Sequence, residues 1–190
     1  QTPAHHLRCG HAGVGRVVLT GCDVPGSQKG ADYCERYSGK NLYCTAGVHP
    51  HDATKFNDNS LAKLRILAQS EHCVAVGECG LDYDRMFSPR ETQLAVFEAQ
   101  ARLAVELSIP LFVHVREVED PEKEKFGAYA EAIAVLAKVN IDPSTVVVHC
   151  FTGDGADFKM LRRYGCKIGL TGFIGIAKRA QGTIAALKED

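Results

Sequence analysis

Six short apolar, β-branched runs alternate with longer segments of helical spacing along this chain of 190 residues. The runs lie at 16–21, 41–48, 73–78, 109–115, 144–150 and 166–173. The segments of helical spacing lie at 31–38, 60–71, 89–108, 126–139 and 154–165. Because the runs are apolar at successive positions, they indicate strands buried on both faces. Repeated strand–helix units of this kind predict an α/β protein with a parallel sheet, either closed as a TIM-type (β/α)₈ barrel or open and doubly wound.

Local signals refine this prediction. An open doubly wound sheet commonly carries a GxGxxG loop after an early strand, and the segment GCDVPGSQKG (21–30) contains glycines in a different order. The open alternative is therefore only weakly supported. Ser88, followed by Pro89 in the first turn, is predicted to cap the helix over 89–108, and Asp154 to cap the helix over 154–165.

Composition limits the class of protein. Residues are 45% hydrophobic and the formal net charge is -1, which predicts one globular domain over 1–190 and no general attraction to nucleic acid. Several of the eight cysteines fall inside apolar runs, so we expect buried, reduced thiols in an intracellular protein, cytoplasmic or nuclear. The sequence has no apolar run long enough for a membrane span and no secretory leader pattern.

Four successive runs end in a polar residue, namely His49, Glu78, His114 and His149, and these residues are about one strand–helix unit apart. In a parallel barrel the carboxyl ends of the strands converge on one face. A carboxylate and two imidazoles there are suitable ligands for a divalent ion. We therefore predict Glu78, His114 and His149 as metal ligands, with the ion activating water and polarising a phosphoryl or carbonyl oxygen.

Other interpretations of these residues are open. A single histidine at a strand end is more commonly a hydrogen-bonded buried group than a ligand, and Glu78 could pair with an arginine across the barrel. Three strands that end alike favour a shared site, because burying a carboxylate without a cation is costly. His72, at a helix end, is expected to be solvated. The segment that contains His5, His6 and His11 is expected to be a tail.

Five motifs resemble successive signatures of the TatD family of metal-dependent deoxyribonucleases. They are GVHPHDA (47–53), VGECGLDYDR (76–85), PLFVHVRE (110–117), VVVHCFTG (146–153) and GLTGFIG (169–175). The resemblance implies an amidohydrolase-like TIM barrel that hydrolyses DNA with Mg²⁺, Mn²⁺ or Zn²⁺, commonly from the 3′ end of a single strand. It implies that Glu78 is a catalytic carboxylate bridging two ions, and that His114 and His149 are imidazole ligands. It also implies that His49, His51 and Arg116 lie around the scissile phosphate.

The family pattern also contains a His-x-His pair on the first barrel strand and an aspartate on the eighth, and neither is matched here. We therefore expect an incomplete barrel with the second to seventh strands, one bound ion instead of two, and possible DNA-backbone contacts from Lys178 or Arg179. One alternative function is a truncated form that binds metal or a partner without turnover. Another is a related amidohydrolase acting on esters, lactones or amides, although those enzymes usually carry a bridging lysine where this chain has Glu78.

Overall fold

The sheet has six parallel strands that follow one another in chain order. The computed structural model describes residues 12–39, 41–118, 120, 122–176 and 181–188. The strands are β1 (Val17–Leu19), β2 (Leu42–Ala46), β3 (Cys73–Asp82), β4 (Leu111–Arg116), β5 (Val146–His149) and β6 (Lys167–Ile168), in the order β1-β2-β3-β4-β5-β6. A doubly wound sheet reverses its strand order at a switch point, whereas a barrel adds each strand beside the last. The predicted barrel-type sheet is confirmed.

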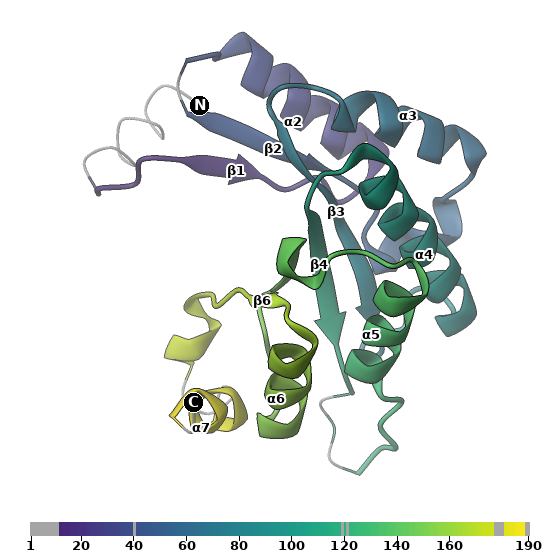
Figure 1. The fold of residues 1–190 in the computed structure, drawn as a ribbon, viewed down its shortest axis with the longest axis vertical. Coiled ribbons are helices and arrows are strands. Elements are labelled where there is room, and N and C mark those ends of the chain that lie inside the picture. Colours follow the sequence, from purple (N-terminus) through teal and green to yellow (C-terminus); the bar gives the residue numbers. More distant parts are fainter. Residues whose placement is uncertain (1–11, 40, 119, 121, 177–180, 189–190) are drawn as a thin grey trace.

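Helices cover the outer face of this curled sheet. They are α2 (Val24–Arg36), α3 (Asp58–Ala68), α4 (Arg90–Leu107), α5 (Ala128–Lys138) and α6 (Gly155–Tyr164), and α7 (Gln181–Lys188) packs against α6. In Figure 1, α2 to α5 lie along one side of β2, β3 and β4. Alternate residues of β4 show the two faces, since Leu111, Val113 and Val115 are buried while the residues between them are half-buried. The core therefore lies between sheet and helices, and the other face carries Phe112 and His114.

One predicted helix start and one predicted helix cap were wrong. Helix α2 begins at Val24 instead of position 31, because the Asp23 side chain accepts a hydrogen bond from the Gly26 N–H and a proline occupies the first turn. Helix α4 begins after Pro89 without a side-chain cap, and the Ser88 hydroxyl instead donates to the backbone carbonyl of His51. Asp154 does cap α6, as predicted, within a capping box.

Strand β3 is longer than predicted, and it continues four residues past Glu78 to Asp82. Its register against β4 shifts between Val76 and Cys79, which is the mark of a bulge. Gly77 and Gly80 have φ angles of 130° and 129°, which only glycine adopts readily. The chain can therefore pass the bulge and resume pairing with β4.

Strand β6 is shorter than predicted. Only Lys167 and Ile168 pair with β5, and the motif GFIG forms a short 3-10 turn, Gly172–Gly175, instead of strand. The seven cysteines that the structure describes are all free, and five of them are buried, as expected. Within the described ranges, no helix is both long and apolar enough to cross a membrane.

Candidate metal centre at the carboxyl ends of the strands

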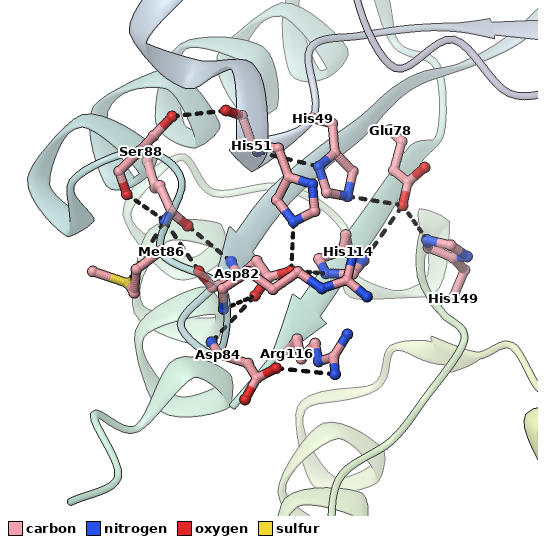
Figure 2. A network of polar contacts seen from close by, with 12 residues as sticks. His49, His51, Glu78, Asp82, Asp84, Met86, Ser88, His114, Arg116 and His149 are labelled. Atoms are coloured by element: carbon pink, nitrogen blue, oxygen red, sulfur yellow. Dashed lines mark hydrogen bonds and ion pairs between the residues drawn. The ribbon is translucent and has the colours of Figure 1, made fainter. Parts of the chain in front are cut away.

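Three imidazoles converge on one oxygen of Glu78. The Oε1 atom lies 2.5 Å from His149 Nε2, 3.4 Å from His114 Nδ1 and 3.5 Å from His49 Nε2. Figure 2 shows the three rings turned toward this carboxylate from different elements: His114 from β4, His149 from the end of β5, and His49 from the segment after β2. We call His49, Glu78, His114 and His149 the imidazole–carboxylate cluster.

Strand pairing accounts for this convergence. His114 and His149 are register partners on adjacent parallel strands, so their side chains leave the sheet on the same face. Glu78 reaches the same face from β3. His49 follows β2 at the start of a short 3-10 helix, Pro50–Lys55, where its Nδ1 accepts the N–H of His51. That hydrogen bond leaves Nε2 of His49 directed toward Glu78.

The donor atoms of the cluster fit a divalent cation. One ligand atom from each of His49, Glu78 and His114 lies within 4.8 Å of the others, and the set comprises one carboxylate oxygen and two imidazole nitrogens. Such sets suit Zn²⁺ and similar ions. His149 contacts the same Glu78 oxygen. The three predicted ligands thus come together, and His49, which the resemblance placed near phosphate, lies close enough to join them.

Burial and charge act against each other in this cluster. Burial raises the pKa of Glu78, but hydrogen bonds from His114 and His149 outweigh it and hold that pKa well below its usual range. Burial, assisted by the nearby charge of His114, lowers the pKa of His49 to about 4. At neutral pH Glu78 is therefore an anion and His49 a neutral imidazole. Glu78 is in the protonation state that a metal ligand requires, whereas neutral His49 carries its ring proton on Nε2, because its Nδ1 accepts the His51 N–H.

Asp82 is a central part of the site that the sequence analysis did not identify. Its side chain is fully buried, and its Oδ2 lies 2.7 Å from His51 Nε2 and 3.3 Å from His114 Nε2. Its Oδ1 accepts the backbone N–H groups of Asp84 and Arg85. Burial raises the pKa of Asp82, and the contacts with His114, Arg85 and His51 more than reverse this effect and lower it.

A glutamine of α4 fixes the position of Asp82. The buried Gln93 accepts the Asp82 N–H through Oε1 at 2.8 Å and donates from Nε2 to the Asp82 carbonyl at 3.1 Å. The same Nε2 donates to the Ser88 carbonyl at 2.8 Å. Gln93 therefore holds both ends of the loop between β3 and α4. Because this loop carries no apolar periodicity, these hydrogen bonds could not be predicted from the sequence.

We expect Asp82→Asn to weaken divalent-ion binding about 10- to 100-fold, because a carboxylate that orients a ligating imidazole contributes about that much to affinity. The substitution keeps the shape of the side chain and removes the charge that faces both His51 and His114. Isothermal titration calorimetry with Mn²⁺ or Zn²⁺ measures the change. Asp58→Asn, at the exposed start of α3, serves as the matched control. Wild-type affinity in the Asp82 variant would contradict the prediction.

His51 and Arg116 lie beside the imidazole–carboxylate cluster. His51 contacts Asp82, and Arg116 Nη2 lies 3.0 Å from Asp84 Oδ2. Figure 2 shows both side chains close to His114. Each keeps part of its surface exposed, so the cationic guanidinium and the imidazole form one polar border of the site.

The prediction for His72 was wrong, and the prediction for Lys178 and Arg179 is not tested. His72 was expected to be solvated, but its side chain is largely buried, with Nε2 3.6 Å from Glu35 and 3.8 Å from Glu71. Its backbone carbonyl accepts the N–H of Cys44 in β2, so the residue lies against the sheet instead of in solvent. Lys178 and Arg179, expected near a DNA backbone, lie outside the described residues.

The fold and the site together define a class. A parallel barrel-type sheet with a carboxylate–imidazole cluster at the carboxyl ends of its strands is the arrangement of TIM-barrel enzymes, whose active sites lie at that face. The chain belongs to the family described as TatD related DNase, whose family model matches residues 3–190.

Relatives and solved structures agree with this family. The chain is 39% identical over 163 residues to the 3'-5' ssDNA/RNA exonuclease TatD of Cronobacter sakazakii, covering 86% of this chain and 57% of the relative. It is 38% identical over 176 residues to the protein of the same name from Erwinia amylovora, covering 92% of this chain and 63% of the relative. The chain thus spans about 57% to 63% of the length of these two relatives.

Two crystal structures share the fold. YJJV, a TatD homolog from Escherichia coli K12, superposes with a TM-score of 0.78 at 27% identity, over 94% of this chain and 64% of that one. A TatD family hydrolase from Entamoeba histolytica gives a TM-score of 0.75 at 26% identity, over 87% of this chain and 55% of that one. The predicted strand arrangement therefore has solved counterparts.

Proposed function

We propose that this chain is a metal-dependent nuclease unit that hydrolyses phosphodiester bonds at the 3′ end of single-stranded DNA. The observation that carries the proposal is the convergence of three imidazoles on Glu78 Oε1, with His51 and Arg116 at the border. The two relatives named as 3'-5' ssDNA/RNA exonucleases support the same substrate class. The carboxylate Glu78, where the related amidohydrolases usually carry a lysine, favours this reaction over hydrolysis of esters, lactones or amides.

Glu78, His114 and His149 would hold one divalent ion, of which Mg²⁺, Mn²⁺ and Zn²⁺ are the candidates. A bound ion of this kind lowers the pKa of water and polarises a phosphoryl oxygen. His49 provides a neutral imidazole on the same side of Glu78. Glu78 supplies the negative charge that offsets the cation in a largely buried position.

The remaining residues act on the phosphate. Arg116 presents a guanidinium, which suits a phosphate oxygen, and Asp84 fixes its direction. His51 offers a ring N–H or a lone pair, according to its tautomer, and Asp82 fixes its orientation. These side chains position a phosphodiester next to the cluster, and positioning by itself contributes substantially to hydrolysis.

The proposal is tested with two measurements on the same chain. Calorimetry with Mn²⁺ is expected to give about one ion per chain, as the predicted ligand set of Glu78, His114 and His149 implies. A 5′-labelled single-stranded oligonucleotide incubated with Mg²⁺ or Mn²⁺ is expected to shorten from its 3′ end, and a blocked 3′ end is the control. Folded chain that binds no ion would overturn the metal assignment.

Ion binding without cleavage would support the second candidate, a form that binds metal or a partner without turnover. The chain spans 57% to 63% of the exonuclease relatives, so the activity in their names belongs to longer chains. The two candidates therefore differ in one measured quantity, the rate of cleavage by ion-loaded chain.

We expect divalent-ion affinity to increase with pH. Burial lowers the pKa of His114, but the contacts with Asp82 and Glu78 outweigh burial and raise it above its ordinary value. In the ion-free chain His114 thus keeps its proton to a higher pH than an ordinary imidazole does, and where that proton is present an ion must displace it. Below that raised pKa the affinity should increase by up to about tenfold per pH unit, and above it the increase should stop.

Calorimetry in two buffers of different ionisation enthalpy measures the number of protons released on ion binding. More protons per ion are expected than an imidazole of ordinary pKa would release at the same pH, because the pKa of His114 is raised in the ion-free chain. An affinity that stays constant between about pH 6 and pH 8 would contradict this assignment.

A further inference from the structure

We propose that Phe87 is a stacking platform for a nucleobase of the bound strand. This inference rests on the proposed function, which it extends from the phosphate to the base. Phe87 is 67% exposed, although it lies directly beside the polar site. A large aromatic side chain gains stability from burial, so a ring left in solvent at this position suggests a ligand that covers it.

The place of the ring fits this role. Its centroid lies 4.7 Å from that of His51, with an angle of 70° between the ring planes. His51 in turn contacts Asp82, which also contacts His114 of the cluster. In a nucleotide, one sugar separates base and phosphate. A phosphate bound by His51 and Arg116 would therefore leave its base within reach of Phe87.

The segment that carries Phe87 is fixed on both sides. Ser88 is buried, its hydroxyl donates to the His51 carbonyl, and its own carbonyl accepts the Gln93 side chain. Met86 contacts the same Gln93 nitrogen through its sulfur. Met86 and Ser88, which flank Phe87 in the sequence, lie next to His51 and Asp82 in Figure 2. A ring held in this way loses little conformational freedom when a base stacks on it.

The charge of the chain also favours a stacking contribution. The formal net charge is -1, so general attraction to a polyanion contributes little. Aromatic platforms bind single strands with little dependence on sequence, because every base has a π-face. Stacking on Phe87 thus provides affinity for single-stranded nucleic acid of any sequence, next to the bond that is to be cleaved.

A fluorescence experiment tests stacking directly, because the chain contains no tryptophan. Phe87→Trp introduces a single indole at the platform, and Ile66→Trp introduces one at a comparably exposed position, 70%, on α3. Both are titrated in EDTA, and again with Mg²⁺, with a short adenine oligonucleotide and with an abasic oligomer of equal length. We expect saturable quenching only in the Phe87 variant and only with bases present. Equal quenching by both oligomers, or bound oligonucleotide without quenching, would overturn the proposal.

A second variant measures the effect on affinity. Phe87→Leu keeps an apolar side chain and removes the π-face, and it is expected to weaken binding of the adenine oligonucleotide roughly tenfold to hundredfold. Binding of the abasic oligomer should not change, and Phe87→Tyr should restore the affinity. An equal loss for both oligomers would indicate a structural role and would also overturn the proposal.

The outcome is separate from that of the proposed function. Base-dependent quenching without cleavage would contradict the nuclease activity but would still support stacking on Phe87. If the wild-type chain cleaves DNA but binds base-containing and abasic ends with equal affinity, the nuclease activity would be supported and stacking on Phe87 would be contradicted.

Discussion

Replacing Glu78 with glutamine is expected to lower divalent-ion affinity more than 100-fold and to abolish any cleavage. Residues that merely support metal ligands contribute about 10- to 100-fold, and Glu78 is the group on which three imidazoles converge. The amide keeps the volume of the side chain but supplies no negative charge. His114 then loses one of the two carboxylates that face it, so its pKa should move back toward its ordinary value.

Calorimetry with Mn²⁺ and the oligonucleotide assay measure the two effects of Glu78→Gln. Glu106→Gln is the matched control, since Glu106 lies on the exposed face of α4 in an ion pair with Arg65. Thermal unfolding of both variants shows whether the fold is retained. A Glu78 variant that is folded and binds the ion with unchanged affinity would contradict the assignment of this cluster as the metal centre.

Gly80→Ala is expected to destabilise the fold by more than about 3 kcal/mol. An added Cβ would lie 2.0 Å from the backbone carbonyl oxygen of His114, and the φ angle of 129° is one that alanine rarely adopts. Strained backbone of this kind and an overpacked contact each contribute about 1 to 3 kcal/mol. Because the opposing atom belongs to the backbone of β4, the clash cannot be relieved by turning a side chain.

Urea unfolding followed by circular dichroism measures the loss of stability in Gly80→Ala. Gly15→Ala is the control, because no described atom lies within 4 Å of a Cβ placed at Gly15, and its φ is not in the positive range. The control should change the free energy of unfolding by well under about 1 kcal/mol. A Gly80 variant as stable as the control would show that β3 and β4 separate more easily than their close approach implies.

Much of the candidate site could be predicted from the polar residues at the ends of the apolar runs. His49, Glu78, His114 and His149 each follow an apolar run, and parallel pairing brings the carboxyl ends of these strands to one face. The register of β4 and β5 gives the reason, since His114 faces His149 directly. The placement of His114 and His149 follows from strand periodicity, which can be recognised in the sequence, whereas the exact positions of His49 and Glu78 also depend on the 3-10 helix after β2 and on the bulge in β3.

Asp82 could not be found in the same way. The apolar run ended at Glu78, so the strand was expected to end there too, and the bulge between Val76 and Cys79 is a property of β3 and β4 together. The early start of α2 was missed because it depends on a single cap at Asp23. Alternation of side chains along a longer β3 would have placed Asp82 on the same face as Glu78, two residues beyond Gly80.

The shared oxygen of Asp82 has a thermodynamic consequence. One atom, Oδ2, faces both His51, at the polar border of the site, and His114, in the imidazole–carboxylate cluster. An ion bound to His114 would change the charge of that ring, and this change would alter the interaction of the same Asp82 oxygen with His51. If both bind as proposed, ion and phosphodiester would be linked ligands, and because linkage is reciprocal each would change the affinity of the other by the same factor.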